Sequence, residues 1–276
     1  IKIDSGVTIT KDHKIGFNSN GSNGIYYLYS STSEATRNSM YDHVTLVDTY
    51  NLMKPNATQG KYTKDSTYYG MLYLGNVLNV TQQKVYTLLA DAVSAATAGD
   101  EIDIIVSHDA GAVTISKNLT IYSSTGATYT GDITTSATTL NLGTSNYPFN
   151  LNGRLATSTT GSGTINYNKG KLYYGSQNNS AVYIYQKILN INDGVIIQQP
   201  LGAPAVTVTR YGTLNMNGGE IFTGSSRTSP NGVGIRFEGG SINIKGGDVY
   251  GSYAIDCTPT GSYGAGPVTI SGGCLV

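Results

Sequence analysis

Apolar and polar residues alternate in short segments that recur along the second half of the chain. Each segment carries an apolar residue, a polar residue and a second apolar residue, and the next segment begins 24 to 28 residues later. Alternation with a period of two is typical of a β-strand that has one buried face. The segments begin at Leu140, Ile165, Leu189, Leu214, Ile242 and Val268. Strands that return at such regular spacing predict a stack of similar coils.

A repeat of about 25 residues is too small to bury its own apolar face, so its copies must stack on one another. From Ile165 onward a glycine follows five residues after each lead residue, where the chain can turn without steric penalty. These glycines are Gly170, Gly194, Gly219, Gly247 and Gly273. Since no helical segment separates the strands, we expect parallel sheets in a solenoid. A β-sandwich is the alternative, but it does not require the same hexapeptide in every coil.

The residues before the repeats show a helical period in place of the period of two. Apolar residues spaced i, i+3, i+4, i+7, i+8 and i+11 predict an amphipathic α-helix over about residues 82–98. They are Val85, Leu88, Leu89, Ala92, Val93 and Ala96. Thr81 is the expected N-cap and Gly99 the expected stop. Such a helix would cover the open apolar end of the first coil, as solenoids require. We therefore predict a solenoid domain over 81–276.

Residues 1–80 form a separate β-rich segment in this interpretation. Ile1–Asp4 and Val7–Thr10 alternate, so they belong either to the last coil of a preceding solenoid or to a small β layer. Tyrosine-rich runs at Gly24–Ser30 and Tyr68–Gly75 predict two further strands. Their tyrosines serve either for packing or as a surface on which sugars stack.

These patterns resemble the right-handed parallel β-helix of pectin-lyase-like proteins from about Lys84 to Val276. The resemblance rests on the helix-Gly-Asp-strand entry between Ala90 and Val106, and on coils such as Leu189-Asn-Ile-Asn-Asp-Gly. Coils that end in Gly-Gly look most like repeats in large surface proteins of Gram-positive bacteria. The resemblance implies an all-β fold, a right-handed parallel β-helix with an N-terminal capping α-helix. It says little about activity, because the fold hosts lyases, hydrolases, esterases, adhesins and tailspikes.

The balanced charge of the chain argues against partners that are strongly anionic. The chain has 17 basic and 17 acidic residues, and only 12% of its residues are charged. We therefore expect neither nucleic-acid binding nor attraction to an anionic membrane. No run approaches the ~18 apolar residues of a membrane span, so no membrane insertion is expected. Few cysteines and a surface of Gly, Ser, Thr, Asn and Tyr favour a secreted protein, extracellular or on the cell surface.

Candidate metal and cofactor chemistry is sparse. His13, His43 and His108 lack histidine partners at ligand spacing, and Cys257 and Cys274 stand 17 residues apart. We expect no metal site and no cofactor. The enzymes of the resembling family carry sequence motifs that this chain lacks. Polygalacturonase-like members carry a Gly-His-Gly, and pectate-lyase-like members carry an Arg-x-Pro-x-x-Arg.

One pair of acids is a weak catalytic candidate. Glu220 and Asp248 each lie six residues after the lead residue of successive coils. Stacked strands lie ~4.8 Å apart, so the two carboxyls could approach the spacing of a retaining glycosidase. The same column contains Lys171, Val195 and Cys274, so a sustained groove of acids is not expected. Exposed acids beside a turn are the simpler interpretation.

The most regular polar feature is a column of asparagines one residue after each lead residue. It comprises Asn141, Asn166, Asn190, Asn215 and Asn243, followed by Thr269. A second column, two residues further, comprises Asn168, Asn192, Asn217, Lys245 and Ser271. Stacked amides can hydrogen-bond from coil to coil without any ligand. Alternatively, Asn166, Asn190, Asn215 and Asn243 line a flat, uncharged face that binds a ligand.

We expect a non-enzymatic extracellular β-solenoid that serves as a stalk, adhesin or assembly segment of a bacterial surface protein. Its partners would be a polysaccharide or another surface protein, or further copies of the chain in head-to-tail association. Because the chain starts with Ile1 and stops within a coil, we expect a trimmed piece of a longer stalk or a polymerising unit. A carbohydrate-active enzyme or carbohydrate-binding module on the outer sheet face is the alternative. A trimeric viral tailspike is a third interpretation.

Overall fold

The structure is a computed structural model of residues 1–276. It describes residues 75–109, 111–158, 161–176, 178–198, 202–226, 229–230, 232–257 and 265–276. Before residue 75 it describes the backbone of short strands.

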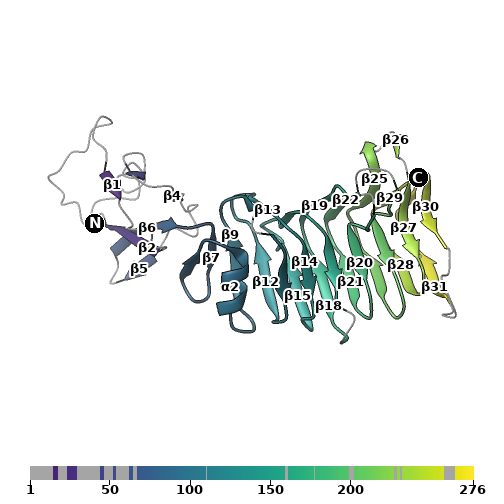
Figure 1. The fold of residues 1–276 in the computed structure, drawn as a ribbon, viewed down its shortest axis with the longest axis horizontal. Coiled ribbons are helices and arrows are strands. Elements are labelled where there is room, and N and C mark those ends of the chain that lie inside the picture. The colour runs from purple at the N-terminus through teal and green to yellow at the C-terminus, as the bar shows by residue number, and fades with distance from the viewer. Residues whose placement is uncertain are drawn as a thin grey trace.

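The second part of the chain winds into a parallel β-solenoid with three sheets along its length (Figure 1). Sheet 1 contains β9 (Glu101–Ile104), β12 (Leu119–Tyr122), β15 (Thr139–Leu142), β18 (Thr164–Tyr167), β21 (Ile188–Ile191), β24 (Thr213–Met216), β28 (Gly240–Ile244) and β31 (Ala265–Ile270). Each of these strands pairs in parallel with the equivalent strand of the next coil. The parallel β-helix predicted from the repeats is confirmed.

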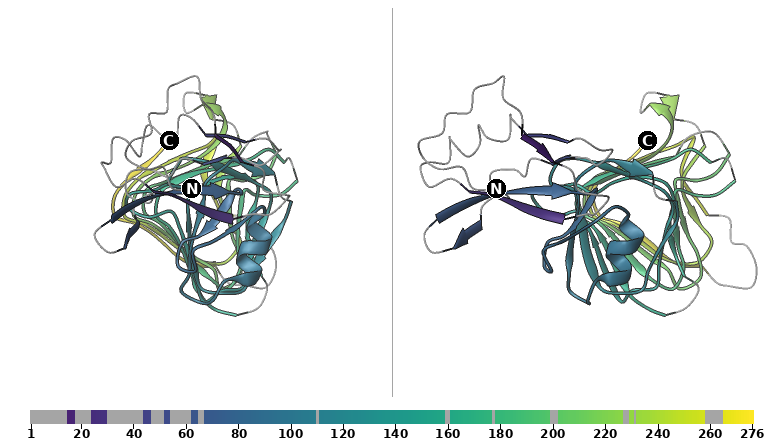
Figure 2. Two further views of the ribbon diagram at one scale, coloured as in Figure 1. Left: turned by 90° about the vertical axis from the view of Figure 1, so that its left-hand side faces the viewer. Right: turned by 60° about the vertical axis from the view of Figure 1, so that its left-hand side comes forward.

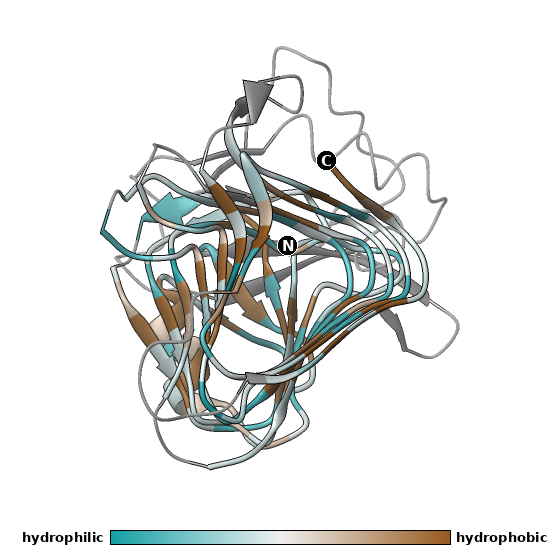
Figure 3. Cartoon of the chain, turned by 90° about the vertical axis from the view of Figure 1, so that its right-hand side faces the viewer, coloured by the Kyte–Doolittle hydropathy of each residue, from teal (hydrophilic) through white to brown (hydrophobic). Residues whose placement is uncertain are grey.

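Sheets 2 and 3 complete each coil. Sheet 2 contains β10 (His108–Asp109), β13 (Thr128–Thr130), β16 (Asn150–Asn152), β19 (Gly170–Tyr174), β22 (Gly194–Gln198), β25 (Glu220–Ser226), β29 (Asp248–Tyr250) and β32 (Cys274–Leu275), and β26 (Ser229–Pro230) pairs antiparallel with β25. Sheet 3 contains β11 (Val113–Ile115), β14 (Ile133–Thr135), β17 (Leu155–Thr157), β20 (Val182–Ile184), β23 (Val206–Val208), β27 (Val233–Phe237) and β30 (Tyr253–Asp256). Seen from the C-terminal end, the coils follow one another around a common interior (Figure 3).

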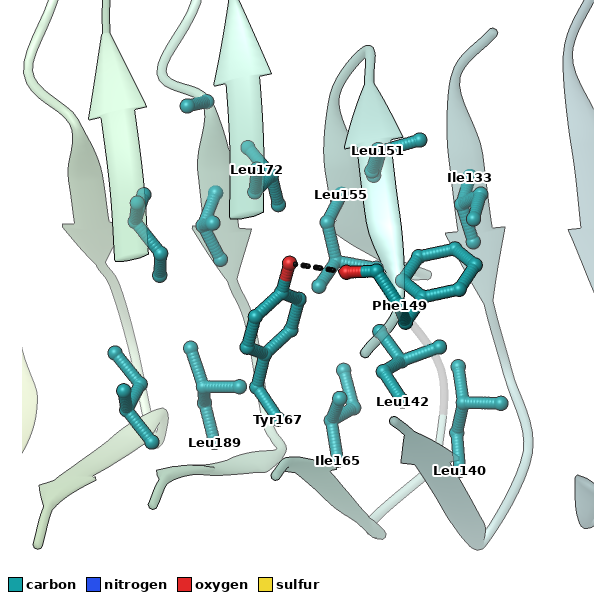
Figure 4. Packing of buried hydrophobic residues seen from close by; sticks show 14 of the residues in the cluster. Ile133, Leu140, Leu142, Phe149, Leu151, Leu155, Ile165, Tyr167, Leu172 and Leu189 are labelled. Carbon is teal, nitrogen blue, oxygen red and sulfur yellow. Dashed lines mark hydrogen bonds between the residues drawn. The ribbon is translucent and has the colours of Figure 1, made fainter. Parts of the chain in front are cut away.

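Equivalent apolar residues lie in register inside the solenoid. Leu140, Ile165 and Leu189 are direct partners on successive strands of sheet 1, and all three are buried. One continuous core cluster extends from Val77 to Val249. Figure 4 shows such side chains pointing from the strands into the interior. Burying a side chain of this size stabilises the fold by roughly 1.5–3 kcal/mol, so the stack supplies the burial that a single coil lacks.

The N-terminal end of the core is covered by a short helix, α2 (Leu89–Ala95), whose Leu89, Ala92 and Val93 are buried in the core cluster. The turned views show this helix beside the coils (Figure 2). None of the described helices is long and apolar enough to span a membrane.

The predicted helix over 82–98 was too long at both ends, since α2 ends at Ala95 with Ala96 as its C-cap, before the expected stop at Gly99. Lys84–Tyr86 is strand β8, which forms a hairpin with β7 (Val77–Asn79), and β7 pairs antiparallel with β9. Thr81 is not the N-cap, because the N-cap is Leu88. The Oγ1 of Thr81 instead accepts a hydrogen bond from the Glu101 amide at 2.9 Å. The backbone N–H and C=O groups of β7 and β8 form hydrogen bonds within sheet 1. These bonds outweigh the helical spacing of the side chains.

Six strands are described before residue 75. They are β1 (Ile15–Phe17), β2 (Gly24–Tyr29), β3 (Val44–Leu46), β4 (Leu52–Met53), β5 (Tyr62–Lys64) and β6 (Thr67–Leu74). The two strands predicted in the tyrosine-rich runs are present as β2 and β6, which pair antiparallel. β4 and β5 also pair antiparallel with β6, so these four strands form a small β layer. The segments Ile1–Asp4 and Val7–Thr10 lie outside the described residues.

Candidate functional site

The outer face of sheet 1 carries an unbroken ladder of asparagine side chains. Each amide donates from Nδ2 to the Oδ1 of the asparagine one coil nearer the N-terminus. The distances are 2.8 Å from Asn166 to Asn141, 2.7 Å from Asn190 to Asn166, 2.8 Å from Asn215 to Asn190 and 2.9 Å from Asn243 to Asn215. Asn141 ends the ladder by donating to Thr120 Oγ1 at 3.2 Å. We call this set the asparagine ladder.

A second ladder runs beside the first. Asn217 donates to Asn192, and Asn192 donates to Asn168, each at 2.8 Å. Asn168 donates in turn to the backbone carbonyl of Gly143 at 3.0 Å. The parallel register explains both ladders, because it brings identical residue types from successive coils directly opposite one another. The columns predicted from the sequence are therefore real, and their amides bond from coil to coil.

The residues two before the asparagine ladder form a third outward column. It comprises Thr139, Thr164, Ile188, Thr213 and Ser241. The hydroxyls of Thr213 and Ser241 lie 3.0 Å apart in hydrogen-bond contact. Sheet 1 therefore presents small, mostly uncharged polar side chains in rows parallel to the solenoid axis. We call this surface the asparagine face.

The ladder leaves capacity for a ligand. An asparagine amide has two N–H donors and a carbonyl oxygen with two acceptor positions. A residue inside the ladder, such as Asn190, uses one donor toward Asn166 and one acceptor position toward Asn215. It therefore retains one donor and one acceptor position. The four sequence-predicted residues Asn166, Asn190, Asn215 and Asn243 lie together on this half-buried row.

The outer face of sheet 3 is less regular than that of sheet 1. The corresponding column of sheet 3 passes from Tyr183 to Thr207, Arg236 and Asp256. Arg236 Nε lies 3.7 Å from Asp256 Oδ2. Arg154 lies over the Tyr183 ring, 5.3 Å from its centroid. No column of sheet 3 repeats one polar residue type through the described coils, so its outer face is less periodic than the asparagine face.

Glu220 and Asp248 are direct partners on β25 and β29, as the sequence predicted. Val195 precedes them in the column and Cys274 follows them, so the acids form one pair and no extended groove. The Tyr250 hydroxyl donates to Asp248 Oδ2 at 3.3 Å. Among the described residues, no group of three or more His, Cys, Asp or Glu side chains is placed to hold a metal ion.

Several buried polar groups were not singled out from the sequence. The Lys187 side chain is 1% exposed, and its Nζ donates to the carbonyls of Ala137 at 2.9 Å, Ser162 at 3.3 Å and Ser136 at 3.4 Å. Burial lowers the pKa of this ammonium. The sequence does contain a signal for this buried group. Lys187 stands directly before a strand of sheet 1, at the position that is Gly163 in the preceding coil and Gly212 in the following coil.

Two buried tyrosines bond through their hydroxyls to backbone carbonyls of the coils. The Tyr167 hydroxyl donates to the Phe149 carbonyl at 3.0 Å (Figure 4), and burial raises its pKa. The Tyr129 hydroxyl donates to the Gly111 carbonyl at 2.7 Å. Burial, with Asp109 and Asp132 nearby, raises the pKa of Tyr129 to about 12. Both side chains therefore stay neutral donors at physiological pH.

The remaining candidate residues are dispersed. His108 lies on β10, where its Nδ1 is 2.8 Å from the Val106 carbonyl oxygen. His13 and His43 lie outside the described residues. Cys257 and Cys274 are exposed free thiols. The described structure thus does not gather these residues into one site.

Fold and surface together define a parallel β-solenoid with a laddered polar face. No protein-family model matches the chain, and no curated protein or solved structure matches it.

Proposed function

We propose that this chain is a non-enzymatic structural segment of a bacterial surface protein, exposed outside the cell as part of a stalk or adhesin. The observation that carries the proposal is the asparagine ladder, in which Nδ2 of each of four successive asparagines bonds to the preceding asparagine. Such bonds join each coil to the next. A surface that ties coils together along the axis suits a stiff spacer.

The interior supports the same role. The core cluster is continuous from the capping helix to the last coils, so the coils stabilise one another as a single rod. The eight parallel strands of sheet 1 span ~34 Å at the usual strand spacing. The resemblance to repeats of Gram-positive surface proteins and the low charge of the chain favour an extracellular location.

Two measurements test this proposal. Antibodies against the chain should label intact cells of the source organism, and labelling that requires permeabilised cells would contradict it. Incubation of the purified chain with a panel of neutral and acidic polysaccharides should release no reducing ends or unsaturated products. Product release by the wild type that disappears in Glu220→Gln or Asp248→Asn would establish the enzymatic alternative, and Asp193→Asn, an exposed acid outside the pair, is the matched control.

Polysaccharide binding on the asparagine face is the second candidate. It is favoured by the rows of amides that retain a donor and an acceptor position at each coil. A glycan array with the full chain should identify the ligand. Binding should fall in Asn192→Ala and Asn217→Ala, which alter exposed amides of the second ladder, and persist in Thr134→Ala on sheet 3. Equal loss in all three variants would indicate a different surface.

Another surface protein and further copies of the chain are also proposed partners. Head-to-tail association of copies predicts a sedimentation coefficient that rises with protein concentration. A concentration-independent monomer value would exclude that mode under the conditions used.

A further inference from the structure

At the N-terminal end of the solenoid, the first strands of sheets 1 and 3 differ in how their outer edges are covered. In sheet 1 the edge of β9 is covered by β7, which pairs antiparallel with it, and β8 extends the sheet beyond β7. In sheet 3 the first strand is β11, which pairs on one side with β14. On its other side, no strand pairs with β11 among the described residues.

The backbone of β11 is oriented for one more strand. The Val113 amide donates to the Asp132 carbonyl at 2.8 Å, and the Ile115 carbonyl accepts from the Ser136 amide at 2.9 Å. In a parallel pair, alternate residues direct their backbone groups toward the same neighbour. The N–H and C=O of Thr114, between these two residues, therefore point away from β14. Thr114 is exposed.

A shallow groove lies along this edge, between β11 and helix α2. Its volume is about 370 Å³, and its lining includes Ala90, Val93 and Ser94 of the helix and Ala112, Thr114 and Ser116 of the β11 segment. These side chains are small and uncharged. Lys117 also borders the groove, but its Nζ donates to the carbonyls of Val93 at 3.1 Å and Ser94 at 2.6 Å at the end of the helix.

We propose that this groove is a docking site for an extended peptide strand, which adds to the edge of β11 by backbone hydrogen bonding. The outward N–H and C=O of Thr114 are matched by an extended main chain, as in other cases of strand addition. The small lining residues and the absence of an acidic lining residue select a peptide with small, uncharged side chains toward the groove. The pairing of β7 with β9 is an example of such strand addition at the same end of the solenoid, on the edge of sheet 1.

Amide hydrogen exchange in the full chain tests whether the edge is open. The Thr114 amide should exchange much faster than the amides of Val113 and Ile115, which face β14. Slow exchange at Thr114 in the free chain would show that another part of the chain already covers the edge, and would overturn the proposal.

The binding probe is the capped peptide acetyl-Ala-Val-Thr-Val-Thr-amide, which has the sequence of residues 205–209 around β23. At a peptide concentration about ten times its Kd, exchange at Thr114 should slow roughly elevenfold. No detectable binding at millimolar peptide, or binding without protection of Thr114, would overturn the proposal.

Two variants locate the site. Thr114→Pro removes the N–H that points into the groove and no N–H that bonds to β14, so the labelled peptide should no longer bind while the thermal unfolding transition persists. Thr114→Val keeps the N–H and should bind within about twofold of the wild type, since the backbone supplies the contact. If Thr114→Pro fails to fold, Ser94→Trp provides an independent test, because it fills the groove from the helix side. Unchanged binding in Ser94→Trp would overturn the proposal.

Discussion

Gly194 lies against the buried ring of Tyr167 so closely that a Cβ at residue 194 would come within 2.1 Å of the ring carbon Cδ1. Tyr167 occupies an interior position that is Leu142 in the preceding coil and Ile191 in the following one. The larger ring fills the corner, where its hydroxyl reaches the Phe149 carbonyl. The tyrosine at residue 167 therefore requires a glycine at residue 194.

This requirement predicts that Gly194→Ala destabilises the protein by about 1–3 kcal/mol, because the methyl group forces the ring from its place. The free energy of unfolding from chemical denaturation measures the effect. In a Tyr167→Leu background the same substitution should be less damaging, with a coupling of about 0.5–3 kcal/mol. Additive effects of the two substitutions would show that the ring is not the obstacle.

The asparagine ladder predicts a positional effect on stability. Asn190→Ala removes two ladder bonds, whereas Asn243→Ala removes the single bond to Asn215. We expect Asn190→Ala to lower the free energy of unfolding by about 1–3 kcal/mol, and Asn243→Ala by less. Asn178→Ala, at an exposed residue outside the sheets, is the control and should have almost no effect. Equal losses at residues 190 and 243 would argue against a ladder that acts bond by bond.

Asp100 predicts loss of stability in acid. Its burial favours a raised pKa, but hydrogen bonds from Asn79, the Thr97 amide and Gln82, with Lys117 nearby, outweigh burial and hold the pKa below its usual value. A lowered carboxyl pKa means that the folded state favours the ionised form. The stabilisation is present above the ordinary pKa of about 3.9 and is lost as the pH falls through the folded value.

Acid titration of the unfolding free energy checks this prediction. Asp100→Asn should be less stable than the wild type at neutral pH. The difference should shrink as the pH falls below about 4, where the carboxyl of the unfolded wild type gains a proton, and should vanish once the pH is below the lowered pKa of the folded state. Asp193→Asn, at an exposed acid, should follow the wild type. A difference at Asp100 that stays constant down to pH 2 would contradict the assignment.

Lys187 predicts a gain of stability with rising pH in the alkaline range. Burial lowers its pKa, so between the folded value and the ordinary value of about 10.4 the unfolded chain binds more protons than the folded chain. The free energy of unfolding contributed by this residue therefore rises with pH through that window. The wild type should gain stability relative to Lys187→Met as the pH rises above the lowered pKa of the folded state and toward 10. Lys245→Met, at an exposed lysine, should show no such trend.

Parallel stacking made the two ladders predictable. Because one coil follows another at nearly constant length, residues 24 to 28 apart in sequence become neighbours, and a column of asparagines in the aligned repeats becomes a row in space. The same rule placed Glu220 beside Asp248 and predicted the unlike residues that flank them. The start of the capping helix was predicted wrongly, since Val85 fits helical spacing but pairs with Leu78 in a hairpin.

The sequence by itself determined the fold class, the inward and outward alternation and the two columns of asparagines, since each follows from a local period repeated at constant coil length. Only the tertiary structure decided that Lys187 reaches carbonyls of two earlier coils, that Asn79 and Gln82 converge on Asp100, and that no described strand pairs with the outer edge of β11. These features arise at corners and at the end of the stack. There the repeat is interrupted, and the positions of backbone groups depend on how separate segments pack.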